Sequence, residues 1–367
     1  MNKNSPKKSS ILLLEDGTIF NGLAIGKSGS TIGEVCFNTG MTGYQEIFTD
    51  PSYYKQIMVA TTIHIGNYGT NRNESESDSI KIAGLICRSF SESSSRAKSD
   101  LNTQEFLIKN NLVAITDIDT RCLIRHIRDK GSMKGIVSSE ITDIRELTSM
   151  LNESPPMEGL ELSSIVSTKQ AYNCGNDNSK IKIAVLDLGI KKSIINNLVE
   201  RGAYVKVFPA KTPFSEMEKW QPSAYFISNG PGDPASMDYG IDTARQILNS
   251  KKTYFGICLG HQLLALANNI KTYKMHNGHR GLNHPVKNLI TNTCEITSQN
   301  HGFAIDINST QDTGNIEITH INLNDKTIEG IRLKNQRAFS VQYHPEAAPG
   351  THDSAYLFDD FMHLINQ

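Results

Sequence analysis

The stretch from residue 254 to 262 reads Tyr254-Phe-Gly-Ile-Cys258-Leu-Gly-His-Gln262, and it predicts the fold of the second half of the chain. Its first residues are aromatic and β-branched, which favours a strand, whereas the continuation Gln262-Leu-Leu-Ala-Leu-Ala267 favours a helix. A cysteine at a sharp strand-to-helix turn, with glycines on both sides, is the pattern of a nucleophile elbow. The helix N-terminus beside Cys258 favours the thiolate, which is the reactive form of this side chain. We therefore expect Cys258 to be a nucleophile.

Strand-like and helix-like segments alternate around this elbow. In chain order they are a strand at 181–187, a helix at 192–199, strands at 203–208 and 224–228, and a helix at 240–248. This alternation predicts an α/β fold with a doubly wound, mostly parallel sheet. Ligands bind such sheets at the carboxyl ends of the strands. Both Cys258 and the turn Gly230-Pro-Gly-Asp-Pro234 follow strand-like runs, so we expect them at the same edge.

A base for the nucleophile is expected in the run Gln342-Tyr-His-Pro-Glu346. His344 is the best candidate among the eleven histidines because it ends another strand-like run, 339–343. Pro345 favours an extended path, in which residues two apart, His344 and Glu346, project to the same side. Glu346 would then hold the His344 ring in the correct tautomer, as the acid does in a Ser-His-Asp triad. The alternative interpretation of this tripeptide is an ordinary surface turn.

Backbone amides are expected to stabilise the oxyanion that such a cysteine generates. The donors are the amide of Leu259, which follows the nucleophile, and one amide from the turn Gly230-Pro-Gly232. Because proline has no N–H, Gly232 is the natural donor in that turn. A plain β-turn would use the same residues, but the position of the turn after a strand favours the donor role.

The first half of the chain has a different pattern from the second. Short apolar segments, such as 81–87 and 112–116, lie between glycine-containing turns, which predicts an N-terminal β-rich mixed α/β domain. At 367 residues the chain is too long for one typical core. The polar stretch at 168–180 has no apolar periodicity and is the best linker candidate. We therefore expect an N-terminal domain at 1–167, a linker at 168–180 and a C-terminal domain at 181–367.

Composition and charge exclude several functions. The formal net charge of −1 gives no basic face for nucleic acid or for an anionic membrane. No apolar run approaches the length of a membrane span, and the N-terminus has no signal-peptide core. The six cysteines are scattered without a CxxC pair, which indicates free thiols in a reducing compartment and a cytoplasmic location.

Motifs for metals and nucleotides are missing from the sequence. His276, His279 and His284 lie near Cys294, but their spacing fits no ligand pattern and no carboxylate lies among them, so we expect no metal site. Neither a Gly-x4-Gly-Lys-Ser/Thr phosphate loop nor a strand-linked GxGxxG is found. We therefore expect no cofactor in this chain, since it shows no means of using ATP or a dinucleotide.

The motifs of both halves resemble those of known families. Residues 181–367 resemble class I, triad-type glutamine amidotransferases through Ser228-Asn-Gly-Pro-Gly-Asp-Pro234, Phe255-Gly-Ile-Cys-Leu-Gly-His-Gln262 and Gln342-Tyr-His-Pro-Glu346. The first half is similar to the N-terminal domain of carbamoyl-phosphate synthase small subunits. The segments of the first half that carry this second resemblance are Phe37-Asn-Thr-Gly-Met-Thr-Gly-Tyr-Gln-Glu46, Thr49-Asp-Pro-Ser-Tyr53, His64-Ile-Gly-Asn67 and Asp117-Ile-Asp-Thr-Arg121. Two segments of the second half, Gln299-Asn-His-Gly-Phe303 and Glu346-Ala-Ala-Pro-Gly350, also resemble the small subunits.

The resemblance implies that the chain hydrolyses L-glutamine to glutamate and ammonia. Cys258 would attack the side-chain amide, His344 would protonate the departing ammonia, and water would release glutamate from the thioester. By the family pattern, glutamine is held by Ser52, Gly230, Gly232, Leu259, Gln262, Asn300, Gly302 and Phe303. Ser52 comes from the N-terminal domain, so the pattern places the site at the domain boundary, a common position for ligand pockets.

The resemblance also implies a partner. Ammonia is mostly protonated in neutral water and then no longer nucleophilic, so it has to pass directly to a large synthetase subunit. That subunit would use ATP, Mg²⁺ and bicarbonate to make carbamoyl phosphate for pyrimidine and arginine biosynthesis, in a heterodimer or an oligomer of heterodimers. Two other functions remain open. A stand-alone γ-glutamyl cysteine hydrolase would leave the first half unexplained, and the intact triad argues against a non-catalytic interaction subunit.

Overall fold

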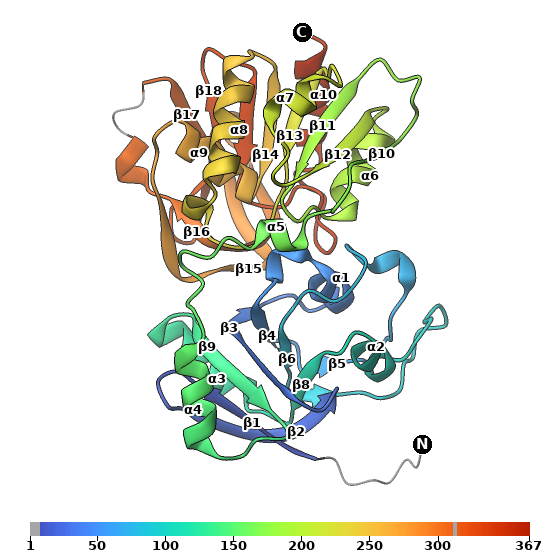
Figure 1. Ribbon diagram of the computed structural model, residues 1–367, viewed down its shortest axis with the longest axis vertical. Coiled ribbons are helices and arrows are strands. Elements are labelled where there is room, and N and C mark those ends of the chain that lie inside the picture. The colour runs from blue at the N-terminus through green and yellow to red at the C-terminus, as the bar shows by residue number, and fades with distance from the viewer. Residues whose placement is uncertain (1–7, 311–313) are drawn as a thin grey trace. The chain divides into compact units, whose positions relative to one another are not determined.

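A computed structural model describes residues 8–310 and 314–367 (Figure 1). The chain divides into two compact units, Met1–Met157 and Glu158–Gln367, and each unit has hydrophobic clusters of its own. Over the described ranges, no helix combines the length and the apolar character that crossing a membrane requires.

The first unit is a closed barrel with short helices around it (Figure 1). Its strands follow the order β1-β2-β8-β6-β4-β3-β9, and β1 pairs antiparallel with both β2 and β9. Leu12 and Leu14 of β1 pack in one cluster with Val59, whereas Leu13 packs on the opposite side with Leu147. The expected β-rich mixed domain is thus confirmed, in the form of a barrel. The strands are β1 (Ser9–Leu14), β2 (Ile19–Gly26), β3 (Ser30–Asn38), β4 (Gln56–Ala60), β6 (Gly84–Ile86), β8 (Val113–Thr116) and β9 (Met133–Ser138), with β5 (His64–Ile65) and β7 (Ser89–Phe90) paired apart from the barrel; the helices are α1 (Tyr44–Thr49), α2 (Thr103–Lys109), α3 (Thr120–Lys130) and α4 (Ile144–Glu153).

The second unit is built on a mixed sheet with the strand order β10-β12-β11-β13-β14-β19-β18-β17-β15-β16. Strands β12, β11, β13, β14 and β19 run parallel, whereas β10 and the strands from β15 to β18 pair antiparallel. The strands are β10 (Tyr172–Cys174), β11 (Lys182–Asp187), β12 (Tyr204–Pro209), β13 (Ala224–Ile227), β14 (Thr253–Ile257), β15 (Thr272–Asn288), β16 (Cys294–Ile305), β17 (Ile316–Asn322), β18 (Ile328–Leu333) and β19 (Ala338–Val341). The helices are α5 (Ser163–Val166), α6 (Lys192–Glu200), α7 (Phe214–Glu218), α8 (Asp238–Asn249), α9 (Leu259–Ala267) and α10 (Tyr356–Ile365).

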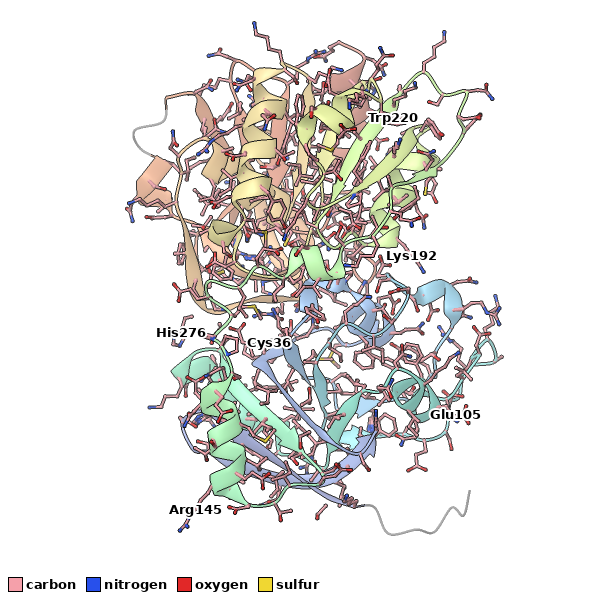
Figure 2. The ribbon with its side chains drawn as sticks, in the orientation of Figure 1. Cys36, Glu105, Arg145, Lys192, Trp220 and His276 are labelled. Atoms are coloured by element: carbon pink, nitrogen blue, oxygen red, sulfur yellow. The ribbon has the colours of Figure 1, made fainter. Side chains whose placement is uncertain are left out.

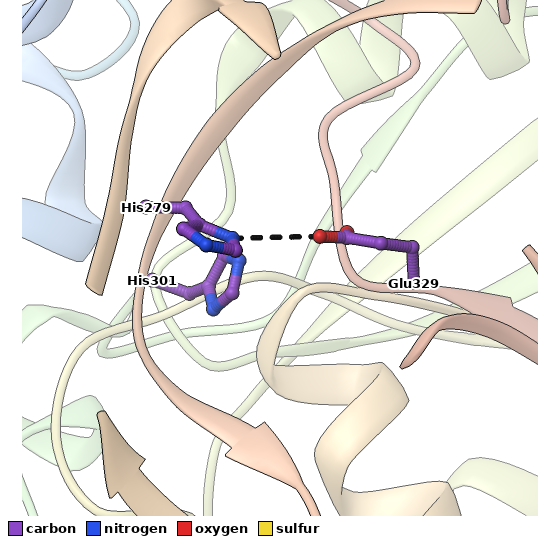
Figure 3. A group of neighbouring side chains, drawn as sticks. All are labelled: His279, His301 and Glu329. Atoms are coloured by element: carbon purple, nitrogen blue, oxygen red, sulfur yellow. Dashed lines mark ion pairs between the residues drawn. The ribbon is translucent and has the colours of Figure 1, made fainter. Parts of the chain in front are cut away.

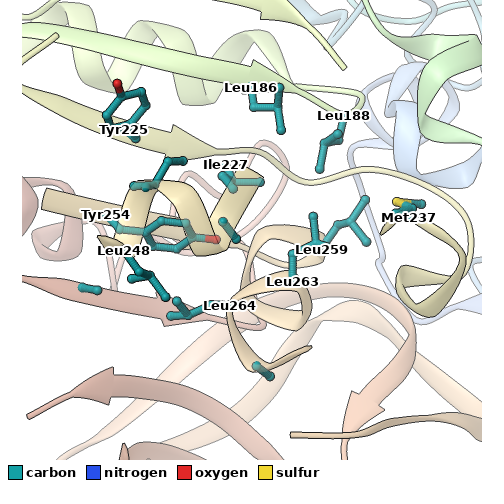
Figure 4. Close-up of a cluster of buried hydrophobic side chains, with 14 of the residues drawn as sticks. Leu186, Leu188, Tyr225, Ile227, Met237, Leu248, Tyr254, Leu259, Leu263 and Leu264 are labelled. Atoms are coloured by element: carbon teal, nitrogen blue, oxygen red, sulfur yellow. The ribbon is translucent and has the colours of Figure 1, made fainter. Parts of the chain in front are cut away.

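Helices cover both faces of this sheet. On one face, Leu186 of β11 belongs to a buried cluster with Leu263 of α9, part of which Figure 4 shows. On the other face, Val185 belongs to a cluster with Leu198 of α6 and Phe361 of α10. Because successive side chains of a strand point to opposite faces, the neighbours Val185 and Leu186 serve different clusters. This double burial explains why the parallel strands are near-continuous apolar runs in the sequence.

The boundary between the units differs from the one expected from the sequence. The structure groups residues 158–180 with the second unit, whereas we expected the N-terminal domain to end at 167 and a linker at 168–180. Asp233 N donates a hydrogen bond to Leu160 O at 2.9 Å, and β10, inside the expected linker, pairs with β12 at the sheet edge. The first residues of β10 are exposed, so this edge strand carries no apolar periodicity. Hydropathy alone could not distinguish it from a linker.

Candidate active site

Cys258 lies at the turn between β14 and α9. β14 ends at Ile257 and α9 begins at Leu259, so a single residue makes the turn. The backbone of Cys258 has φ 54° and ψ −100°, which is uncommon for a residue that carries a side chain. The residue is only 2% exposed. The predicted strand–cysteine–helix turn is confirmed, and its strained backbone is of the kind that functional sites retain.

The glycines on either side of Cys258 are required for steric reasons. A Cβ on Gly256 would lie 2.6 Å from the carbonyl oxygen of Gly260. A Cβ on Gly260 would collide with the carbonyl oxygen of Ile227, at the end of the neighbouring strand β13. Both contacts involve backbone, which cannot move aside as a flexible side chain could. The Gly-x-Cys-x-Gly spacing therefore lets α9 begin directly against the sheet edge.

His344 and Glu346 form a buried pair next to a lysine. His344 Nδ1 lies 2.6 Å from Glu346 Oε1. Lys191 Nζ donates to the same oxygen at 2.9 Å and to the carbonyl oxygen of Ala347 at 2.6 Å. The three charged side chains are at most 3% exposed. Lys191 was not predicted from the sequence, although its position just after the strand predicted at 181–187 puts it at the edge where the site was expected.

The backbone from His344 to Glu346 is not extended, so this part of the prediction is wrong. The residues form a turn that is closed by a hydrogen bond of 3.0 Å from Ala347 N to His344 O. Pro345 restricts φ to a value that turns use as well as extended chains, so the proline could not decide between them. His344 N also donates to Ser298 O at 2.9 Å, which attaches the turn to β16.

Electrostatics favour a protonated ring beside an ionised carboxylate. Burial opposes the charged form of His344, but the Glu346 carboxylate and Cys258 outweigh it and raise the pKa of His344 to about 10. Burial likewise disfavours the Glu346 carboxylate, yet the Lys191 ammonium and His344 lower the pKa of Glu346 to about 2. The pair is thus a buried imidazolium–carboxylate pair at neutral pH, and the lysine holds the carboxylate ionised.

Cys258 and His344 lie close enough for Cys258 to raise the pKa of His344. The thiol of Cys258 donates to Asn300 O at a distance of 3.5 Å. His344 Nε2, the ring nitrogen that Glu346 does not hold, is buried and has no hydrogen-bond partner in the described part of the chain. Cys258 nonetheless acts on the pKa of His344, so sulfur and ring are close. Nε2 is therefore the ring nitrogen available to the thiol.

The turn after β13 lies against the elbow. Gly260 N donates to Ser228 O at 3.1 Å, and a Cβ on Gly230 would come within 3.0 Å of the Leu259 side chain. Gly232 has φ 100°, a conformation that favours glycine, and a Cβ there would lie 2.6 Å from a backbone oxygen of the 158–180 segment. Because β13 and β14 are parallel neighbours, the turn and Cys258 lie at the same edge, as predicted.

Two family models match this chain. The model of class-I glutamine amidotransferases matches residues 184–364, and that of the carbamoyl-phosphate synthase small chain, CPSase domain, matches residues 12–137. The carbamoyl phosphate synthase small chain of Chlorobaculum tepidum is 47% identical over 359 residues, covering 97% of this chain and 98% of the relative. The small chains of Pectobacterium atrosepticum (45% over 374 residues, 98% and 97% covered) and Salmonella typhimurium (44% over 376 residues, 98% and 98% covered) are similar to the same extent.

This chain belongs to the carbamoyl-phosphate synthase small-chain family. Its second unit carries the class I glutamine amidotransferase domain of that family. The family assignment made from the sequence motifs is therefore confirmed for both halves of the chain.

In the structure, most of the residues that we expect to hold glutamine lie around the elbow. Gln262 Nε2 donates to Phe303 O at 2.8 Å. The Cys258 thiol donates to Asn300 O, as described above. The β16 segment from Asn300 through Gly302 to Phe303 therefore runs past the elbow. These residues join the turn at 230–232 and the first turn of α9 on one side of the second unit.

Ser52 belongs to the first unit of the small chain. It lies in a single 3₁₀ turn, Pro51–Tyr53, and is 4% exposed. Its N–H donates to Asp50 Oδ1 at 2.9 Å, so Asp50 caps this turn. The role of Ser52 in glutamine binding stays a prediction.

Two other histidines of the amidotransferase domain, His261 and His279, have surroundings that differ from those of His344. His261, beside the elbow, has its Nδ1 2.9 Å from Ser340 Oγ, and burial lowers the pKa of His261 to about 3, so the ring is neutral and structural. His279 lies with His301 and Glu329 in a group whose potential metal-ligand atoms are all within 4.8 Å of one another. This group was not predicted from the sequence, because its members come from three different strands.

Proposed function

We propose that this small chain hydrolyses L-glutamine with Cys258 as nucleophile, His344 as general acid and base, and Glu346 as the group that orients the ring. The observation that carries the proposal is the buried Glu346–His344 pair beside a cysteine at a strained strand-to-helix turn. A serine-type triad has the same order of contacts, with the acid on one ring nitrogen and the nucleophile at the other. We also assign the second unit to the doubly wound class, since helices cover both faces of its parallel strands.

The reaction would begin with attack of the Cys258 sulfur on the side-chain amide carbon of glutamine. The raised pKa of His344 keeps the ring protonated at neutral pH, and an imidazolium stabilises the thiolate beside it. As the S–C bond forms, the carbonyl π electrons move to oxygen, and the N–H groups of Leu259 and Gly232 would bind this oxyanion. Collapse of the intermediate breaks the C–N bond, and the nitrogen takes the proton of His344 and leaves as ammonia.

A water molecule would complete the cycle. His344, now neutral, accepts a proton from water as the oxygen attacks the thioester carbon. The second intermediate breaks its C–S bond, which releases glutamate and restores the Cys258 thiolate beside a protonated ring. Glu346 stays ionised throughout, because the Lys191 ammonium and His344 lower its pKa to about 2, and it keeps Nδ1 protonated. Hydrolysis by this route needs no cofactor in the chain and no metal ion.

Glutamine would be held by groups on several elements. Its amide would lie between the elbow and the β16 segment, and its α-amino and α-carboxylate groups would bind further along the same edge. Gln262 is fixed for such a role, since its side-chain amide donates to Phe303 O at 2.8 Å and to Gln342 Oε1 at 3.0 Å. The proposed binding residues are Ser52, Gly230, Gly232, Leu259, Gln262, Asn300, Gly302 and Phe303.

We propose that the ammonia produced passes to a partner, the large subunit of carbamoyl-phosphate synthase. Ammonia loses its nucleophilicity once it is protonated, so it is useful only if it is delivered directly. The small-chain name of the relatives supports a two-subunit enzyme, in which the large subunit binds ATP, Mg²⁺ and bicarbonate and forms carbamoyl phosphate. We propose a cytoplasmic heterodimer, or an oligomer of heterodimers, that serves pyrimidine and arginine biosynthesis.

Co-purification from the native cell tests the partner. A large ATP-binding chain should come down with this one, and ATP with bicarbonate should raise the glutaminase rate several-fold over that of the isolated chain. Such coupling between two sites typically amounts to about 1–3 kcal/mol. The Cys258→Ser variant is the matched control, because it should bind the partner and glutamine without hydrolysis. Full glutaminase activity that ignores ATP, with no large chain recovered, would instead favour a stand-alone γ-glutamyl hydrolase.

A further inference from the structure

A second group of ligand-type side chains lies in the sheet of the amidotransferase domain. His279 on β15 and His301 on β16 are direct partners in the antiparallel register, and Glu329 comes from β18 (Figure 3). One potential ligand atom from each residue lies within 4.8 Å of the other two. His279 Nδ1 and Glu329 Oε1 are 3.5 Å apart. Two ligand atoms of a tetrahedral ion at ~2.0–2.1 Å would be roughly 3.4 Å apart, so this spacing fits one edge of a metal site.

Glu329 is a buried carboxylate with incomplete hydrogen bonding. The residue is 0% exposed. Its Oε1 accepts from Asn322 Nδ2 at 2.9 Å and lies 3.5 Å from Thr327 Oγ1. Its Oε2 is buried and has no hydrogen-bond partner among the residues that the structure describes. A buried carboxylate oxygen without a donor is costly, and a cation bound to it would remove that cost.

His301 has an oxygen acceptor beside each of its ring nitrogens. The residue is 5% exposed, and its Nδ1 lies 2.8 Å from Phe303 O. A neutral ring can donate to only one of two acceptors, and in the tautomer that donates to the Phe303 carbonyl from Nδ1 the lone pair lies on Nε2. Nε2 lies 2.8 Å from Gln299 Oε1, another acceptor, and the amide nitrogen of Gln299 donates to Thr297 Oγ1 at 3.2 Å. A histidine that binds a metal typically donates its other N–H to such a carbonyl.

The ring of His279 is oriented by a carboxylate, as that of His301 is by a backbone carbonyl. Its Nε2 lies 2.9 Å from Asp325 Oδ2, which leaves Nδ1 toward Glu329. Nδ1 is also 3.4 Å from the Asn322 amide. A carboxylate–histidine pair of this type fixes the ring and raises its basicity as a ligand. His284 packs beside it with ring centroids 5.2 Å apart, and the buried Nδ1 of His284 has no partner within the described ranges, so His284 is a candidate for a fourth ligand.

We propose that His279, His301 and Glu329 bind one divalent transition-metal ion of the zinc type. Two imidazoles and one carboxylate suit Zn²⁺ and its neighbours, whereas Ca²⁺ and Mg²⁺ prefer oxygen ligands alone. Asp325 and Glu329 place two carboxylates beside His279, and negative charge of this kind attracts a cation. The ion would hold β16 in place where that strand passes Cys258, since His301 follows Asn300 directly. The site does not depend on the proposed glutaminase function.

Zinc titration of the full chain tests the site. The experiment uses the Cys258→Ser protein, because a reactive thiolate would bind zinc by itself. After dialysis against a chelator, titration of Zn²⁺ against a chromophoric competitor should give one tight equivalent per chain. Glu329→Gln, which keeps the shape of the side chain, and His279→Gln should each weaken that binding at least tenfold. His276→Gln is the matched control, because His276 is exposed on the same strand.

X-ray absorption on zinc bound to the Cys258→Ser chain gives a result that does not depend on how the ligand variants fold. The proposal expects nitrogen and oxygen ligands at about 2.0–2.1 Å, imidazole scattering from two rings, and no sulfur at about 2.3 Å. No stoichiometric zinc, zinc binding that Glu329→Gln leaves unchanged, or binding that His276→Gln abolishes would each overturn it. The three residues would then form only a hydrogen-bond network in which a proton on His279 takes the place of the cation.

Discussion

Replacing Lys191 by methionine would leave the Glu346 carboxylate buried without its ammonium partner. The pair is 2.9 Å apart, and the two side chains are 3% and 0% exposed. Removing one partner of a buried ion pair costs about 3–5 kcal/mol, because the other charge remains in a poor solvent. The pKa of Glu346 gives a second value for this free-energy cost. A fall from 4.5 to about 2 corresponds to about 3 kcal/mol at ~1.36 kcal/mol per unit, shared between Lys191 and His344.

We therefore expect Lys191→Met to lower the unfolding free energy of the second unit by about 3 kcal/mol. For a unit of about 200 residues, each kcal/mol shifts the melting temperature by about 2–4 °C, so the expected fall is about 6–12 °C. Trp220 is the only tryptophan of the chain and packs with Tyr204 and Phe208 in the second unit, so its fluorescence reports the unfolding of that unit. Lys192→Met, at the exposed neighbour, is the control and should change stability by about 0.5 kcal/mol or less (Figure 2).

The pH dependence provides a sharper test of the same reasoning. Because the folded-state pKa of Glu346 is depressed, its contribution to stability is present above pH 4.5 and is lost as the pH falls toward 2. The difference between the native chain and Lys191→Met should therefore be largest near neutral pH and shrink below pH 4.5. A difference that stays constant with pH, or an equal loss in Lys192→Met, would refute the assignment of the loss to a buried ion pair.

Four further substitutions test the elbow and the triad. Cys258→Ser should keep the fold and lose nearly all glutamine hydrolysis, and a glutamine-analogue electrophile should label Cys258 and none of the other five cysteines in peptide mass spectrometry. His344→Asn should lower kcat by about 10²–10⁴-fold, whereas Glu346→Gln should retain measurable turnover; the reverse order in steady-state kinetics would contradict the assigned roles. Gly260→Ala should destabilise by about 1–3 kcal/mol because its Cβ meets a backbone carbonyl of β13, whereas Gly314→Ala, with open space around it, should melt close to the native chain.

Local chemistry made the elbow predictable from the sequence. Strand propensity, a cysteine and two glycines lie within nine residues, and each glycine is explained by a backbone atom that a Cβ would meet. The parallel strands were predictable for a related reason, since burial on both faces makes them continuous apolar runs. The edge strand β10 is polar and was taken for a linker, because one exposed face removes that signal.

Contacts between residues far apart in the sequence could not be predicted in the same way. Lys191 meets Glu346 only because the chain returns to the same sheet edge, and no spacing rule links the two. The group of His279, His301 and Glu329 was missed for this reason as well. In the sequence, His279 lies near His276 and no carboxylate lies among the neighbouring histidines. In the structure, the sheet brings the Glu329 carboxylate from β18 next to His279.

The most direct test of the central claim is mass spectrometry of the chain quenched in acid during glutamine turnover. A thioester between Cys258 and the γ-carbonyl of glutamate is stable enough in acid to be found on the peptide that contains Cys258. We predict a glutamyl adduct on Cys258, in an amount that falls as glutamine is exhausted and that is absent from Cys258→Ser. Sustained release of glutamate without this adduct, or an adduct on another cysteine that disappears at the rate of turnover, would contradict the account.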